Sequence, residues 1–314
     1  MWKSLAAAFV TAAALASGLA KADRPDEFTQ GMETMWEVMW HQSGIPTRLV
    51  RWEEDIQVRV TGVNAAAHRQ PTLQALRAVA AEAGVRVIDV SDAPDAAQRA
   101  NLSIEITPDT ELSENQPCET RLDFQAEDRI ESASLHMRDA DAARCIYHEA
   151  MHVMGVRGHP EGDTVLSYFT SHVEGLQPLD KAMLKAWYSP QVRGGMTPFE
   201  VMPVLAEELV KIHPDRQHAL QSRDRFFAQT IQQMQAFAEG RGDVPEIVKR
   251  CGKATDAGIR VGRMEMSYFL GVAYQQGATV AKDGAQAARW LQRAASLGSR
   301  TAQARLSSTA PARS

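Results

Sequence analysis

The sequence predicts an α+β protein in which a domain with a twisted mixed sheet is followed by an all-α region. Two observations predict this fold class. Patterns typical of strands and of amphipathic helices alternate between residues 49 and 188, whereas only helical patterns occur from Thr197 onward. The chain also has 314 residues, which is more than one hydrophobic core usually organises, so two domains are expected. We place them at residues 23–195 and 196–314, after a leader of residues 1–22.

The first 22 residues have the pattern of a secretory signal peptide. Lys3 precedes an Ala-rich apolar run over residues 5–20, and small residues at positions 18, 20 and 22 offer a cleavage site. An uncleaved membrane anchor is the alternative, although the run is short and only mildly apolar for a membrane span. We therefore expect a protein of the bacterial cell envelope, secreted or periplasmic, without stable membrane insertion after cleavage.

The charge of the chain bears on its partners. Loss of the leader removes Lys3 and Lys21 and changes the formal net charge from -5 to -7. A mildly acidic protein without a cluster of basic residues is not expected to bind nucleic acid as its main partner.

The N-terminal third of the mature chain contains a helix followed by strands. Methionine and tryptophan residues at helical spacing predict a core-facing helix that ends near residues 44–46: Met32, Met35, Trp36, Met39 and Trp40. Residues 49–52 and 55–60 alternate as strands, which suggests a hairpin or a long twisted pair.

A helix and three strands follow. Residues 71–83 form an amphipathic helix whose inward side chains are Leu73, Leu76, Val79 and Ala80. Residues 85–90 and 102–106 are short strands, and residues 130–138 are a longer one with Ala133, Leu135 and Met137 on one face.

A histidine motif then begins on the next predicted helix, residues 141–154. His148 and His152 lie one turn apart on the same face, where two imidazoles can share one metal ion. Glu149 lies beside that face, where a carboxylate can take a proton from metal-bound water without being a ligand. Gly155 lets the backbone turn sharply and can bring His159 back as a third ligand.

His148-Glu149-x-x-His152-x-x-Gly155, followed by His159, resembles the zinc-binding signature of the metzincin peptidases, a group of the zincins. That signature has its third histidine three residues after the glycine, where this sequence has Gly158. The one-residue insertion makes His159 the expected ligand and leaves Asp163 as the alternative.

A second segment carries the same resemblance. Residues 164–168 are similar to the Met-turn that lies beneath the metal in metzincins, with Leu166 in place of the methionine. Leu can fill the same apolar volume. Tyr168 then matches the tyrosine that several metzincins use as a weak ligand or as a hydrogen-bond donor to the transition state.

The resemblance also implies a role for the strand of residues 130–138, which comes before the helix of the histidines. In metzincins that strand is an antiparallel edge that receives an extended peptide, although a solvated edge strand would have the same sequence.

Cysteines flank this strand. Cys118 and Cys145 could form a disulfide in an oxidising compartment, which would tie the start of the helix to the sheet. A Cys145 thiolate as metal ligand is the alternative. Cys251 is left without a partner and is expected to be buried.

Further metal ligands could come from His172 and Glu174, which follow Tyr168. For His172 we expect a place on a loop at the wall of the cleft. Glu174 lies where the gluzincins supply a third ligand, but Gly175 and Pro178 make a helix there improbable. Residues 178–188 form the next predicted helix, which corresponds to the closing helix of a metzincin domain. Residues 187–198 resemble a segment of uncharacterised secreted bacterial proteins of zincin type, some of which have lost the histidines.

The helical region contains a repeat-like segment. Residues 264–298 resemble one Sel1-like repeat, a relative of the tetratricopeptide helical hairpin, and Leu306 follows Leu270 by 36 residues as if a second copy began. One repeat cannot bury its own faces, so we expect it to pack on the other helices or on a partner protein.

The metzincin resemblance implies a zinc-dependent metalloendopeptidase that acts on a peptide or protein substrate. His148, His152 and His159 would hold Zn²⁺, which lowers the pKa of a bound water. Glu149 would take the proton of that water and pass it to the leaving amine, and Tyr168 would help to stabilise the oxyanion. A catalytically inactive zinc-binding scaffold that recruits a protein through its Sel1-like repeat is the alternative. A helical adaptor with a chance motif would bind no metal.

Overall fold

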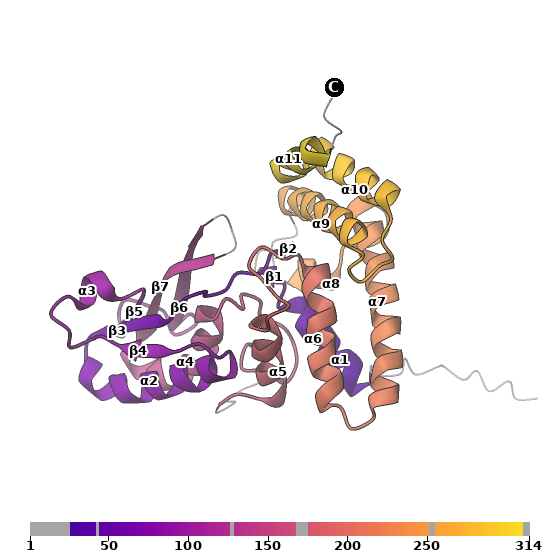
Figure 1. Cartoon of the computed structure of the whole chain (residues 1–314). Coiled ribbons are helices and arrows are strands. Elements are labelled where there is room, and N and C mark those ends of the chain that lie inside the picture. Colours follow the sequence, from indigo (N-terminus) through magenta and orange to yellow (C-terminus); the bar gives the residue numbers. More distant parts are fainter. Residues whose placement is uncertain (1–25, 42–43, 126–128, 168–174, 251–254, 310–314) are drawn as a thin grey trace, which may run out of the picture.

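The computed structural model describes residues 26–41, 44–125, 129–167, 175–250 and 255–309 (Figure 1). These residues form a mixed α/β protein with a five-stranded, mostly parallel sheet and eleven α-helices. The leader, Tyr168, His172, Glu174 and Cys251 lie outside the described residues.

The sheet has the strand order β4-β3-β5-β7-β6. The strands β3, β4, β5 and β7 are parallel, and β6 is antiparallel to β7. Their bounds are Ile56–Gly62 for β3, Val87–Asp89 for β4, Leu102–Thr107 for β5, Cys118–Gln125 for β6 and Arg129–Arg138 for β7.

The predicted pairing of residues 49–52 with residues 55–60 is wrong. Arg51 forms only a single bridge, with Arg129, and β3 has β4 and β5 as its two neighbours. Because both edges of β3 are occupied by parallel strands, no edge remains for a hairpin partner. The apolar side chains of Leu49, Val50 and Trp52 are buried in the core instead.

The expectation that residues 130–138 form the edge strand is also wrong. β7 lies between β5 and β6, and the antiparallel edge strand is β6. β6 could not be recognised from the sequence because its residues are mostly polar, as suits a strand that is partly exposed at a sheet edge. The predicted inward face of β7 is confirmed, since Ala133, Leu135 and Met137 are buried.

Two helices cover one face of the sheet, namely α2 (Ala65–Glu82) and α4 (Ala142–Val153), which also contact each other (Figure 1). The four predicted inward side chains of α2 are all buried: Leu73, Leu76, Val79 and Ala80. α2 begins six residues before the predicted start at Pro71, which lies within the helix. The short α3 (Ala96–Arg99) precedes β5, and a 3-10 turn, η1 (Asp139–Asp141), precedes α4.

The remaining helices form a second group that includes the first helix of the chain. α1 (Glu27–Glu37) packs against α6 (Pro198–Ile212) and α7 (Arg216–Glu239) (Figure 1). The two-stranded pair β1 (Trp40–His41) and β2 (Ile45–Pro46) follows α1, and β2 contacts α9. The bounds of the other helices are Pro178–Trp187 for α5, Glu246–Arg250 for α8, Asp256–Gln276 for α9, Gly284–Ser296 for α10 and Arg300–Thr309 for α11.

The Sel1-like segment spans most of α9 and all of α10, which pack against each other. A Cβ at Gly271 would lie 2.7 Å from the Leu291 side chain, so the two helices approach closely at that point. Trp290 and Leu291 are buried beside it. In the part of the chain that the structure describes, no helix combines the length and the apolarity needed to cross a membrane.

Candidate metal centre

α4 sets the positions of the first two histidines. Its apolar face, with Ile146, Ala150 and Met151, is buried against the core, which fixes the rotation of the helix about its axis. His148 and His152 are half-buried and lie one turn apart, so both rings point to the same side of the helix.

Gly155 ends the helix with a turn that only glycine allows without strain. Its φ is +92°, and a Cβ there would lie 2.2 Å from the carbonyl oxygen of Val50. The turn reverses the chain, so that His159 returns to the two helical histidines.

Gly158, the residue before His159, lies against the end of α1. The loop passes so close to the end of α1 that a Cβ at Gly158 would lie 2.5 Å from Cα of Val38 and 2.6 Å from the carbonyl oxygen of Glu37. No side chain fits at this position. His159 follows directly after this contact with α1.

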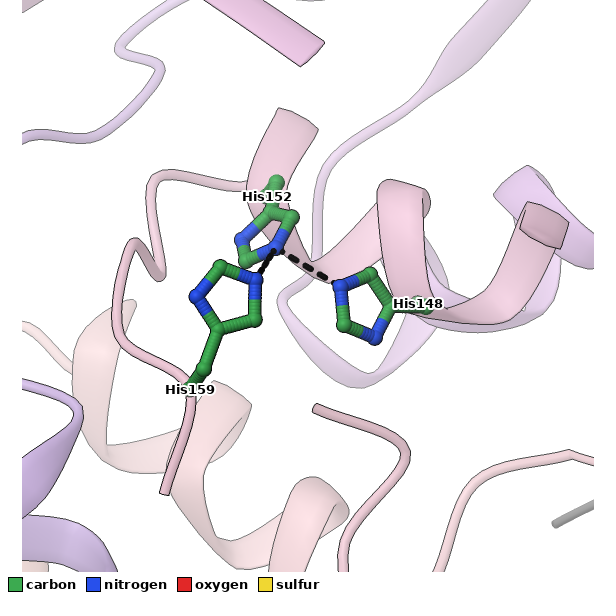
Figure 2. A group of neighbouring side chains, drawn as sticks. All are labelled: His148, His152 and His159. Carbon is green, nitrogen blue, oxygen red and sulfur yellow. Dashed lines mark hydrogen bonds between the residues drawn. The ribbon is translucent and has the colours of Figure 1, made fainter. Parts of the chain in front are cut away.

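The three imidazoles converge on one point (Figure 2). Nε2 of His152 lies 3.0 Å from Nε2 of His148 and 2.9 Å from Nε2 of His159. All three ligand atoms lie within 4.8 Å of one another. This group could therefore hold one metal ion.

The hydrogen bonds on the far side of two rings fix their tautomers. Nδ1 of His148 lies 2.9 Å from the carbonyl oxygen of Val165, and Nδ1 of His152 lies 2.6 Å from that of Val156. A carbonyl oxygen can only accept, so both Nδ1 atoms carry the hydrogen. The neutral rings then present their lone pairs at Nε2, as metal-binding histidines do.

The arrangement of lone pairs fits a cation. Two unprotonated Nε2 atoms 3.0 Å apart repel each other, and a cation between them removes that repulsion. A proton is a poor substitute, because burial, together with His152, lowers the pKa of His148 to about 4. Three neutral imidazoles are the donor set preferred by zinc, copper, iron and nickel.

Glu149 follows His148 on α4, and its side chain is buried, with 6% exposure. The hydroxyl of Thr120 on β6 donates a hydrogen bond of 2.6 Å to Oε2 of Glu149. Burial raises the pKa of Glu149, whereas the neighbouring His148 and the Thr120 hydrogen bond oppose that rise. Thr120 could not be selected from the sequence, because the polar sequence of β6 does not indicate a strand.

The segment that resembles the Met-turn lies directly behind His148, which bonds to its Val165 carbonyl. Leu166 is fully buried there. The buried carboxylate of Asp180 on α5 accepts hydrogen bonds from the backbone amide of Val165 and the hydroxyl of Thr164. Asp180 thus anchors this segment. It also caps α5, since the backbone amide of Gln177 donates a hydrogen bond of 2.8 Å to its carboxylate.

Two aromatic residues for which the sequence indicated no such role support the end of α4. Nε1 of Trp52 donates a hydrogen bond of 2.7 Å to the Val153 carbonyl, and the Tyr188 hydroxyl donates one of 2.9 Å to the Met154 carbonyl. These two carbonyls lie at the helix end, where no further turn of the helix can supply an amide donor. Burial raises the pKa of Tyr188, which keeps its hydroxyl protonated as a donor.

Cys118 and Cys145 form a disulfide with their Cα atoms 6.3 Å apart. The bond joins the start of β6 to α4 three residues before His148. Because its sulfur is bonded to Cys118, Cys145 does not act as a thiolate ligand in this state. Asp163, the alternative third ligand, is exposed and does not belong to the converging group.

A comparison of the chain with protein families, with curated proteins and with solved structures finds no match. The function must therefore be inferred from the site itself.

Proposed function

We propose that this protein is a zinc-dependent metallopeptidase of metzincin type. The observation that carries the proposal is the convergence of three imidazole Nε2 atoms next to a buried glutamate that follows the first histidine directly. In zincins the same residue types at the same helical spacing form the catalytic centre.

Zinc is the proposed metal because three histidines are a ligand set of catalytic zinc sites, in which water would take the fourth position. Three protein ligands and one open position are typical of catalytic zinc sites. Bound zinc lowers the pKa of water toward neutrality and polarises a carbonyl group.

Glu149 is the proposed general base and acid. Its burial raises its pKa, which makes the carboxylate a better proton acceptor than an exposed glutamate. The Thr120 hydrogen bond holds Oε2 and leaves Oε1 as the oxygen that would take the proton. The same oxygen would then deliver the proton to the leaving amine of the substrate.

β6 is the proposed docking strand for the substrate. It pairs with β7 on one side only, and in the described residues no strand pairs with its other side. An extended peptide could add to this edge by main-chain hydrogen bonds. Thr120 places the first half of β6 beside Glu149, so a peptide bound there would pass close to the histidines.

The disulfide supports the proposed location outside the cytoplasm. Disulfides persist in oxidising compartments such as the bacterial periplasm and the extracellular space. The pairing of Cys118 with Cys145 therefore agrees with the leader-like pattern of residues 1–22.

The proposal is tested with the mature chain loaded with zinc and with its Glu149→Gln variant. The wild type should cleave members of a broad peptide library, and a chelator should abolish cleavage. The variant should bind zinc as tightly as the wild type and should lose at least about a thousandfold in kcat, because it lacks the base. Stoichiometric zinc without chelator-sensitive cleavage would instead favour an inactive scaffold with a protein partner at the Sel1-like repeat.

A further inference from the structure

We propose that the helical part of the protein positions the third metal ligand. α1 and Arg250 of α8 hold the loop that carries His159, and through this loop they set the affinity of the site for zinc. The inference rests on metal binding by the three histidines and is independent of peptide hydrolysis.

His159 depends on its surroundings more than the other two histidines do. His148 and His152 are fixed by α4, whereas His159 lies on a loop without regular secondary structure. A ligand on a loop must be held by contacts outside the loop if the site is to be formed before the metal binds. These contacts come from α1 and α8.

The first contact joins the loop to α1 through Thr34. Its buried hydroxyl donates a hydrogen bond of 2.8 Å to the carbonyl oxygen of Glu161, two residues after His159. Nearby, the backbone amide of Glu161 donates a hydrogen bond of 3.0 Å to Oε2 of Glu37. α1 therefore binds both polar backbone groups of Glu161.

The second contact adds Arg250 from the last turn of α8. Nη1 of Arg250 lies 2.9 Å from Oε1 of Glu161, and Nη2 pairs with the Glu37 carboxylate. The side chains of Arg250 and Glu37 are only 24% and 14% exposed. The guanidinium of Arg250 on α8 thus contacts Glu37 on α1 with one nitrogen and Glu161 on the loop with another. Lysine has a single ammonium nitrogen and could not reproduce both contacts fully.

The third contact is steric and lies on the other side of His159. Gly158 lies against the backbone of Val38 and Glu37 at the end of α1, with no room for a Cβ. The residues on both sides of His159 are therefore held by the same helix. A shift of α1 or the loss of Arg250 would move the His159 ring relative to His148 and His152.

The test measures zinc affinity by competition with a chromophoric chelator, using the full mature chain. Arg250→Met removes the charge and both ion pairs while keeping an apolar side chain of similar reach. Arg250→Lys keeps the charge and should restore part of the affinity. Lys249→Met is the matched control, because Lys249 is the neighbouring basic residue and pairs only with Glu246 in the described structure.

We expect Arg250→Met to weaken zinc binding about tenfold, as loss of a supporting residue around a metal site typically does. Lys249→Met should change it less than twofold. The decisive comparison is made in the His159→Ala background, where Arg250→Met should have almost no further effect, because the ligand that it positions is absent. Thermal unfolding of the metal-free variants separates this effect from a general loss of stability.

Equal zinc affinity of the wild type and Arg250→Met would overturn the inference. So would an equal effect of Arg250→Met with and without His159, because Arg250 would then act on the protein in general. Failure of the wild type to bind zinc would overturn both the inference and the proposed function. Tight zinc binding without hydrolysis would overturn only the peptidase proposal.

Discussion

The Glu149 carboxylate is buried and accepts a hydrogen bond of 2.6 Å from the Thr120 hydroxyl. A hydrogen bond to a charged group contributes about 1.5–3 kcal/mol, so this contact should orient the proposed base. Thr120→Val keeps the shape of the side chain but removes the donor. We expect kcat to fall about tenfold or more with little change in KM, as measured by steady-state peptide hydrolysis.

Thr120→Ser supplies the matched control for that substitution. It retains the hydroxyl and should keep most of the wild-type kcat, while zinc content should be unchanged in both variants. If Thr120→Val and Thr120→Ser had equal kcat values, the hydroxyl would have no part in orienting Glu149.

The hydrogen bond from Trp52 to the Val153 carbonyl should stabilise the folded protein. Trp52→Phe retains an aromatic ring but leaves the buried Val153 carbonyl at the end of α4 without its indole donor. An unsatisfied buried acceptor costs about 1–3 kcal/mol, and we expect a loss of that size in the free energy of unfolding. Urea denaturation of the metal-free protein measures it, and a stability equal to that of the wild type would argue against this role of Trp52.

Among the elements, those with strong apolar periodicity could be predicted from the sequence. The helix around the histidines, the inward face of α2 and the strand β7 were all found in this way. β6 was missed because its own sequence is polar and half-exposed. Such a segment becomes a strand through its pairing with a neighbouring strand, which the sequence does not reveal. The predicted pairing of β3 with residues 49–52 was wrong for a related reason, since strand pairing is decided by contacts between residues that are distant in sequence.

The candidate site likewise contains residues that could be predicted from the sequence and residues that could not. The spacing of His148 and His152 and the glycine after the helix were sufficient to predict their convergence with His159. Thr120, Asp180 and Arg250 could not be selected from the sequence, because their roles depend on which element lies next to the site.

The disulfide between Cys118 on β6 and Cys145 on α4 should stabilise the fold. Its loop spans a sequence separation of 27 residues, for which loop-closure entropy predicts a stabilisation of about 3–4 kcal/mol. The double variant Cys118→Ser, Cys145→Ser should lose stability of that order in urea denaturation under oxidising conditions. Wild-type protein treated with a reductant should approach the same value, and an unchanged midpoint in the double variant would contradict the estimate.

For the whole molecule, the position of α1 links the two expected domains. α1 comes first in the chain, yet it packs against α6 and α7 and also supports the loop of His159. The domain boundary near residue 195 remains a prediction from sequence. The packing of α1 indicates that the two parts depend on each other.

A fragment of residues 23–195 should therefore fold poorly. It would lack α6 and α7, so Met32 and Met35 on α1, both fully buried in the intact chain, would lose part of their packing. We expect the fragment to show reduced thermal cooperativity by circular dichroism and weak zinc binding. A fragment that unfolds cooperatively and binds zinc as tightly as the full mature chain would show that the first domain is independent.

Metal analysis of the purified mature chain, combined with X-ray absorption at the zinc edge, tests the central claim most directly. We predict one zinc per chain, bound by the three imidazole nitrogens that converge in the structure, and a coordination shell with one imidazole fewer in His159→Ala. A wild-type protein without stoichiometric metal, or a spectrum with fewer than three imidazole ligands, would contradict it.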